Sequence, residues 1–223
     1  MPKDLFCLPG EIRIKIYSHL LVHNDNIDPW DRGYGLSPNI LATSKRTLHE
    51  ARLVLYGCNC FNIFWEPDKV EEFFKTIGLL NARLIRSIRI AFPLRTNKDN
   101  FNYNNEPVCE DFGLTIMKII IKFCANVKSV TFSLMSIELL GCSSVRDYAL
   151  IMAEVDSRLR EIPALEQVIV EFYRPGFALN ILQEISGLGW LLCNLGDGSL
   201  YCPKSLIGDD DDDHLDGDED NDE

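Results

Sequence analysis

Apolar residues near the N-terminus recur at the spacing of a helix. Segment 8–21 carries two neighbouring apolar rows, and only four of its last nine residues are polar. The rows consist of Ile12, Ile16 and Leu20, and of Ile14, Tyr17 and Leu21. Pro9 suits the first turn of such a helix, and Glu11 complements its positive N-terminal dipole. A helix that is apolar over so much of its circumference needs two partners or burial on most sides, which indicates an interface.

A second helical unit follows the polar segment 23–36. Ser37 and Pro38 form a helix start, because a hydroxyl cap precedes a proline at the first helical position. Apolar residues keep the helical period as far as Gly57, which is placed to follow the last helical residue. The pattern fits one long helix or two shorter helices that meet near 43–45.

The polar segment itself contains two aromatic residues, Trp30 and Tyr34. Exposed aromatic residues in a long loop often mark contact sites. The alternative is that Trp30 folds back onto the helices, and in that position it could also cover the first helix.

After Gly57 the pattern alternates between helix and strand. Strands are predicted over 60–65, 84–92, 126–134 and 164–172, and helices over 68–78, 111–124 and 145–160. Asp68 is placed to cap the first of these helices, and Gly78 to end it. Near the C-terminus, 190–193 and 200–202 flank an Asp-Gly pair and predict a hairpin.

Three of these strands share one apolar spacing. The matching positions are Ile85, Ile88 and Ile90, then Val127, Val130 and Phe132, then Leu165, Val168 and Val170. A strand of this spacing preceded by a helix is the core of leucine-rich-repeat geometry, although the separations exceed the usual period. The predicted fold is therefore of the α+β or α/β class. It has a small N-terminal helical module followed by helix–strand repeats, which form a largely parallel, irregular leucine-rich-repeat-like sheet.

Residues between these apolar positions point to the other face of the predicted sheet. They are Ser87, Arg89 and Ala91, then Ser129, Thr131 and Ser133, then Gln167, Ile169 and Glu171. Small polar side chains in the middle strand, with Arg89 and Glu171 on opposite sides, would let a polypeptide approach and be oriented by charge. We therefore expect a substrate-binding face that includes Ser87, Arg89, Ser129, Thr131, Gln167 and Glu171. The alternative is that another element covers this face, with Ile169 as its buried member.

Charge is distributed unevenly along the 223 residues. The net charge is −12, but segment 209–223 holds 11 acidic residues and no Lys or Arg. Without it, 23 acidic residues face 22 basic ones, so the folded body is near neutral and non-specific nucleic acid binding is disfavoured. Such a run of like charges is expected to be disordered. An incomplete match to a calcium loop at 212–223 has no exiting helix and predicts no calcium site.

Targeting and catalytic signals are weak in this chain. The N-terminus lacks a secretory pattern, and the apolar run 114–127 is too short to span a bilayer, so a cytoplasmic and/or nuclear protein is expected. The eight cysteines are interpreted as small buried hydrophobic residues kept reduced. Cys58 and Cys60 have no second pair at zinc-ligand spacing, and no histidine stands in a triad context. No catalytic residue, metal site or cofactor is predicted, and enzymatic activity is not expected.

The N-terminal sequence resembles a known family. LPGEIRIKIYSHLL, followed by ILATSKRTLHEARLVLYGCNCFNI, is similar to the N-terminal region of fungal F-box-like proteins. The matching residues are Leu8, Pro9, Glu11, Ile12, Ile16, Tyr17, Thr43, Leu55, Tyr56, Gly57, Asn59 and Phe61. The resemblance covers roughly residues 5–92. The link between the first two helices is long for that family, and TSKRTLHE stands where Val-Cys-(Lys/Arg)-x-Trp is usual.

The resemblance implies a function as well as a fold. In F-box proteins the Leu-Pro turn and first helix dock on a Skp-type adaptor of a cullin–RING ubiquitin ligase, and the C-terminal part selects a protein substrate. The implied adaptor-binding residues are Leu8, Pro9, Glu11, Ile12, Ile16, Tyr17 and Leu20. The alternative is that this apolar row packs against 40–55, in a structural or scaffolding protein that keeps the fold but does not bind the adaptor. The expected organisation is a helical module at 1–57, a repeat domain at 58–207 and an acidic tail at 208–223.

Overall fold

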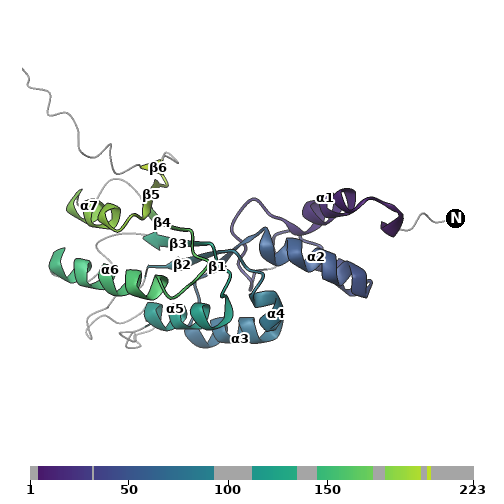
Figure 1. The fold of residues 1–223 in the computed structure, drawn as a ribbon, viewed down its shortest axis with the longest axis horizontal. Coiled ribbons are helices and arrows are strands. Elements are labelled where there is room, and N and C mark those ends of the chain that lie inside the picture. The colour runs from purple at the N-terminus through teal and green to yellow at the C-terminus, as the bar shows by residue number, and fades with distance from the viewer. Residues whose placement is uncertain are drawn as a thin grey trace, which may run out of the picture.

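The protein is a mixed α/β fold built around one six-stranded sheet. The computed structural model describes residues 5–31, 33–92, 112–134, 145–172, 179–196 and 200–201. The strands follow one another across the sheet in sequence order, β1-β2-β3-β4-β5-β6. Figure 1 shows two N-terminal helices side by side at one end of the molecule and the helix–strand units at the other.

The N-terminal helical elements are η1 (Leu5–Cys7), α1 (Gly10–Leu21), η2 (Pro38–Ala42) and α2 (Lys45–Gly57). Of these, α1 and α2 run in the same direction. Arg13, in the first turns of α1, contacts Glu50, whereas the end of α1 meets the end of α2. Because the chain must return along the whole length of α1 before it starts α2, the connection between the two helices is long.

The second helical unit is broken, as one of the two sequence interpretations predicts. The short 3₁₀ helix η2 begins at Pro38, and α2 starts separately after Ser44. The Ser44 hydroxyl accepts a hydrogen bond from the Thr47 backbone N–H at 3.0 Å, which caps α2. Gly57 is the last residue of α2 rather than the residue after it, and Cys58 occupies the C-cap position.

Five parallel strands and one antiparallel strand make the sheet. The strands are β1 (Cys60–Ile63), β2 (Ser87–Ala91), β3 (Ser129–Leu134), β4 (Gln167–Phe172), β5 (Leu191–Asn194) and β6 (Leu200–Tyr201). Strand β6 pairs antiparallel with β5, so the predicted C-terminal hairpin is confirmed. The helices are α3 (Pro67–Ile77), α4 (Leu79–Ala82), α5 (Phe112–Phe123), α6 (Val145–Leu159) and α7 (Leu179–Gly187).

The predicted alignment of three strands is confirmed by their register. Ile88, Val130 and Val168 are paired partners across β2, β3 and β4, and all three are buried. Helix α7 was not predicted from the sequence; it precedes β5, which is a further parallel strand next to β4. Extending the register places Phe61 at one end of this row, and Trp190 precedes β5 at the other.

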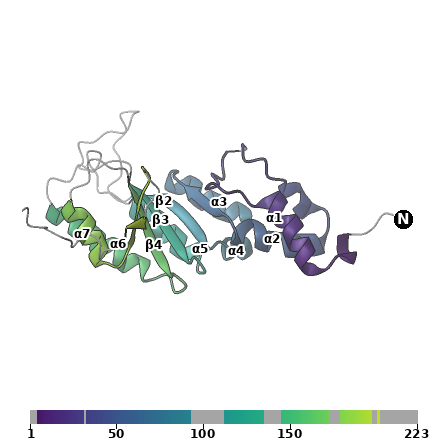
Figure 2. The same ribbon diagram turned by 90° about the horizontal axis from the view of Figure 1, so that it is seen from above.

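All the long helices that follow β1 lie in one layer. Parallel strands in sequence order, joined by the usual right-handed crossovers, place each connecting helix on the same face of the sheet. Contacts run between α3 and α5, between α5 and α6, and between α6 and α7. Figure 2 shows these helices in that order along the sheet. The opposite face therefore receives no long helix from the part of the chain that the structure describes.

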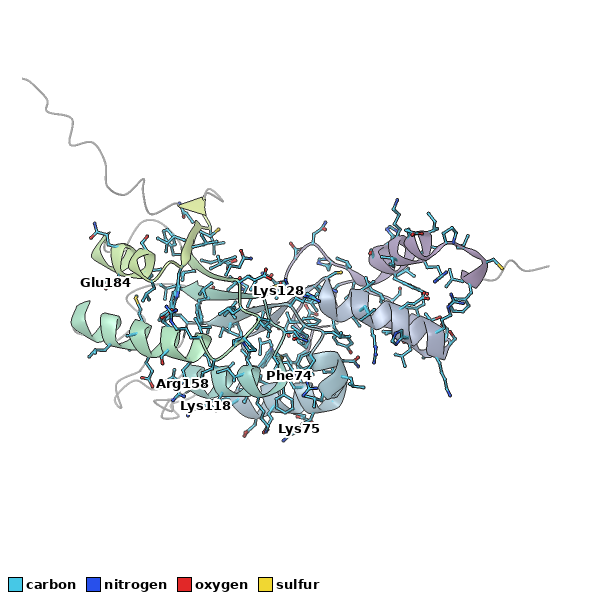
Figure 3. All side chains as sticks on the ribbon, viewed as in Figure 1. Phe74, Lys75, Lys118, Lys128, Arg158 and Glu184 are labelled. Atoms are coloured by element: carbon cyan, nitrogen blue, oxygen red, sulfur yellow. The ribbon has the colours of Figure 1, made fainter. Side chains whose placement is uncertain are left out.

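The main core lies between this helical layer and the sheet. Phe74 of α3 is fully buried, while its neighbour Lys75 is exposed, and Figure 3 shows both side chains. The helix α3 begins at Pro67, so Asp68 lies within the first turn rather than at the cap. Gly78 ends α3 as predicted, with a positive φ of 79° that favours glycine.

The N-terminal helices have a smaller core of their own. It contains the buried side chains of Tyr17, Leu21, Ala51 and Val54 and is separate from the main core. Pro9 immediately precedes α1 instead of lying within it.

Among the described helices, none has both the length and the apolar character that a membrane span requires. The acidic tail with its calcium-loop match lies outside the described residues.

Candidate functional site

Helix α1 buries only one line of its circumference. Arg13, Tyr17 and Leu21 face α2, with exposed fractions of 8%, 0% and 0%. Ile12 and Ile14 lie on the two flanks of this line and are 41% and 52% exposed. A helix with apolar residues on both flanks and burial along one line retains apolar surface that the protein itself does not cover.

The predicted adaptor-binding row divides into two parts in the structure. Leu8 is 39% exposed, Pro9, Glu11 and Ile12 are also exposed, and Ile16 is half-buried. Tyr17 is fully buried, so its assignment as a contact residue is wrong: its ring packs in the small core and its hydroxyl donates to Glu50 at 3.2 Å. Leu20 packs against the same core. The accessible part of the row is thus its N-terminal half.

Arg13 holds this exposed turn in place. Its Nε and Nη2 donate to the two carboxylate oxygens of Glu50 at 2.8 Å each, and its Nη1 donates to the Leu8 carbonyl. A bidentate pair of this kind fixes orientation as well as distance. Hydrogen bonds from Arg13 lower the pKa of Glu50 to about 2, with a further contribution from Arg46. Neither Arg13 nor Glu50 was predicted as a functional residue. Both are charged, and the sequence pattern places charged residues on the surface of a helix.

Asn59 joins the ends of the two N-terminal helices. Its Nδ2 donates to the carbonyl oxygens of Leu21 and Leu55, both at 2.7 Å, and its Oδ1 accepts from the His23 N–H at 2.9 Å. Carbonyls in the last turn of a helix lack partners within the helix, so one amide satisfies both ends. Asn59 is only 1% exposed. Asn59 is one of the residues that match the fungal F-box-like proteins, but no role was predicted for it from the sequence.

The aromatic loop packs onto the body instead of forming a free contact site. The Trp30 ring lies 5.4 Å from the Trp65 ring and 5.7 Å from the Phe73 ring, centroid to centroid. Asp28 accepts hydrogen bonds from the Trp30 N–H and from Trp65 Nε1. The interpretation in which Trp30 folds back is therefore the one the structure favours, but Trp30 packs near β1 and α3 rather than over α1. The exposed row on α1 stays uncovered.

The residues of the predicted substrate-binding face lie side by side on the sheet, at the positions that the strand register gives them. Ser87 pairs with Ser129 and Gln167 along one level of the sheet, and Arg89, Thr131 and Ile169 pair at the next. Ser129, Thr131 and Ser133 of the middle strand are each 8% exposed, and Ile169 is half-buried. On this face the small side chains of β3 are therefore buried more deeply than Ile169. The longer side chains on the neighbouring strands are able to reach over them.

Arg89 and Glu171 are partners rather than two separate charges. Arg89 Nε donates to Glu171 Oε2 at 2.7 Å, and both side chains are 16% exposed. Arg89 also donates to Ser133 Oγ at 3.0 Å and to Asn62 Oδ1 at 3.3 Å, and its guanidinium lies 4.9 Å from the Phe64 ring centre. The expectation that opposite charges on the two sides would orient a polypeptide needs this correction, because the pair is neutral as a unit.

The described cysteines do not form one class. Cys124 is buried as predicted, whereas Cys7 and Cys58 are exposed. Cys60 lies at the sheet face beside Arg89, and burial raises the pKa of its thiol to about 11. A raised pKa keeps this thiol protonated and a weak nucleophile at neutral pH. Within the described ranges, no three His, Cys, Asp or Glu side chains come together as a metal site.

Neither the family models nor the curated proteins nor the solved structures to which the chain was compared give a match.

Proposed function

We propose that the protein is a non-enzymatic interaction adaptor, and that it recruits a protein substrate to a cullin–RING ubiquitin ligase through an F-box-like N-terminal module. The single observation that carries the proposal is the exposed apolar turn of Leu8, Pro9 and Ile12 at the start of α1. These are the residues that the resemblance to fungal F-box-like proteins makes adaptor contacts. Apolar residues exposed together at a fixed turn are what a docking surface requires.

The rigidity of this turn supports the same proposal. Arg13 ties the Leu8 carbonyl to Glu50 of α2, so the turn keeps its shape without a partner. A binding surface that is already ordered loses less conformational entropy when a partner docks.

The repeat region is the part that would select the substrate. We interpret its sequential parallel sheet with one helical layer as an irregular leucine-rich-repeat-like domain. The sheet face away from the helices carries Arg89, Thr131 and Glu171 at its centre, and Gln167 is exposed at its edge. Because Arg89 and Glu171 neutralise each other, we expect hydrogen bonding and shape, rather than net charge, to govern recognition there.

A scaffolding protein that does not bind the ligase adaptor is the second candidate. It is favoured by the inward packing of Tyr17 and Leu20, which leaves the adaptor fewer contact residues than the resemblance implies. The two candidates differ in one measurable property, which is the formation of a complex with a Skp-type adaptor.

The decisive experiment measures binding of the purified chain to a purified Skp-type adaptor. Ile12→Ala removes an exposed anchor, and a central anchor contributes about 1–3 kcal/mol, so affinity should fall by roughly 5- to 150-fold. Ile14→Ala is the matched control, because Ile14 is equally apolar, more exposed and on the opposite flank of α1. Equal losses for the two variants would contradict the assigned row. Absence of any complex with the wild-type chain would favour the scaffolding candidate.

A further inference from the structure

A pocket of about 580 Å³ lies where the N-terminal helices meet the sheet. Its wall comes from loop 23–36, from η2 and α2, from β1 and from α3. The exposed α1 row and the sheet face around Arg89 contribute no described residue to it. Pockets of this size at the junction of two structural units are common binding sites for small groups and side chains.

Aromatic residues form much of the pocket wall. Tyr34, Tyr56, Phe61 and Phe73 all line it. The Phe61 ring stacks on Tyr56 and lies next to Phe73, with both centroid separations at 6.1 Å. The aromatic wall is therefore continuous, and an aromatic ring presents a negative electrostatic face to a cation.

The only charges on the described wall are negative. Asp28 and Asp31 line the pocket, and none of the described lining residues is Lys, Arg or His. Asp28 is held in place by its bonds from Trp30 and Trp65, yet a carboxylate has about four acceptor positions and can accept more. Asp31 is exposed, and one of its oxygens accepts from the Gly33 N–H at 2.9 Å. Two carboxylates beside aromatic rings are complementary to a cation and unfavourable for an anion.

We propose that this pocket binds an arginine side chain presented by a partner polypeptide. The aliphatic stem of arginine would lie on the apolar wall, while its guanidinium would meet the carboxylates and the aromatic faces. Arginine is favoured over lysine because a planar guanidinium stacks on aromatic rings and is less strongly hydrated than an ammonium. The site is independent of the adaptor-binding proposal, since the two share no residue.

The three tryptophans provide the readout. Trp65 Nε1 donates to Asp28, and Trp30 packs on the same cluster, whereas Trp190 donates to Asp156 elsewhere in the protein. In titrations of the full chain with N-acetyl-arginine amide, we expect a saturable NMR shift of the Trp65 and Trp30 indole signals and none at Trp190. N-acetyl-citrulline amide has nearly the same shape without the charge and should bind at least about fivefold more weakly. Equal affinity for the two compounds, or equal shifts at all three tryptophans, would overturn the proposal.

Charge variants at one rim position provide an internal control. Asn39 lines the pocket and is exposed, so its substitution should leave the fold intact. Asn39→Lys should weaken binding of N-acetyl-arginine amide by about threefold and Asn39→Glu should strengthen it, the size expected of one exposed charge. Identical affinities for the two variants would show that charge does not govern the site.

Two further arms identify the source of the arginine. A five-residue peptide, acetyl-Gly-Ser-Arg-Ser-Gly-amide, should bind at least as tightly as N-acetyl-arginine amide if the pocket accepts a side chain from a polypeptide. Weaker binding of the peptide would mean that the pocket takes only a free organic cation. Binding that occurs only after Arg32→Gln would mean that an arginine of this chain is the occupant. Either result would overturn the proposal, and Ile12→Ala should change none of these affinities.

Discussion

Arg89 and Glu171 form an ion pair across the middle strand of the sheet, with 2.7 Å between Arg89 Nε and Glu171 Oε2 although 82 residues separate them in sequence. Ser133 of the strand between them accepts a third hydrogen bond of the same guanidinium. Because Arg89 also donates to Asn62 of β1, side chains connect the four strands β1 to β4 as well as their backbone ladder does. The pair also decides the electrostatic character of the candidate substrate face, which is polar but locally neutral.

Removal of both partners should destabilise the fold by less than the sum of the two single removals. Glu171→Leu leaves Arg89 without its carboxylate at a largely buried position, and we expect the free energy of unfolding to fall by about 1–3 kcal/mol. In the variant Arg89→Leu/Glu171→Leu the loss should be smaller than the sum of the two single losses, because no uncompensated charge remains. Urea denaturation of the four proteins gives the coupling energy. Additive losses would mean that the pair contributes no mutual stabilisation.

The sheet could be predicted from the sequence because the pattern that defines it, the order of apolar and polar residues, is read directly along the chain. Alternation of apolar and polar residues fixes which side chains share a face, and the repeated spacing aligned Ile88, Val130 and Val168 in the register that the structure shows. Residues 190–193 were predicted as a hairpin strand, but helix α7 before them was missed, because the apolar row of this unit begins before the four-residue strand β5, at Trp190. The fourth crossover therefore does not repeat the three-position pattern of the others.

The candidate sites were harder to predict because they depend on side-chain conformation. Periodicity places Ile12 and Tyr17 in neighbouring rows of one helix, but it does not say which row meets α2. The structure decides this through Arg13, a charged residue that faces inward because Glu50 neutralises it. A pattern that treats every arginine as a surface residue assigns the wrong face of α1 to the core.

The two rows of α1 should respond differently to truncation. Tyr17→Ala opens a cavity in the small core and removes a hydrogen bond to Glu50, so we expect a loss of about 3–5 kcal/mol in unfolding free energy. Ile12→Ala changes an exposed residue and should alter stability by no more than about 0.5 kcal/mol. Thermal or urea unfolding monitored by circular dichroism compares the two. Equal destabilisation would mean that Ile12 belongs to the core and would remove the basis for a docking surface.

The Arg13–Glu50 pair should make stability depend on pH in an acidic window. The folded-state pKa of Glu50 is lowered from 4.5 to about 2, chiefly by hydrogen bonds from Arg13. Its contribution is therefore fully present above pH 4.5 and is lost as the pH falls towards 2, because the unfolded chain takes up the proton first. The difference in unfolding free energy between wild type and Glu50→Gln should shrink across this window. Arg13→Gln removes the hydrogen bonds that lower this pKa and should flatten the profile in the same window.

Asn59→Asp should destabilise the protein although Asp has nearly the same shape as Asn. Asn59→Ala removes the donor of two helix-terminal carbonyls and should lower the unfolding free energy by about 1–3 kcal/mol. Asn59→Asp keeps the acceptor for the His23 N–H but points a carboxylate at the carbonyl oxygens of Leu21 and Leu55. Because a buried carboxylate facing two acceptors favours its protonated form, Asn59→Asp should be less stable at pH 7 than at pH 4, relative to wild type at each pH. Urea unfolding at the two pH values tests this, and a penalty that does not grow with pH would show that the amide donor at Asn59 is not what joins the two helices.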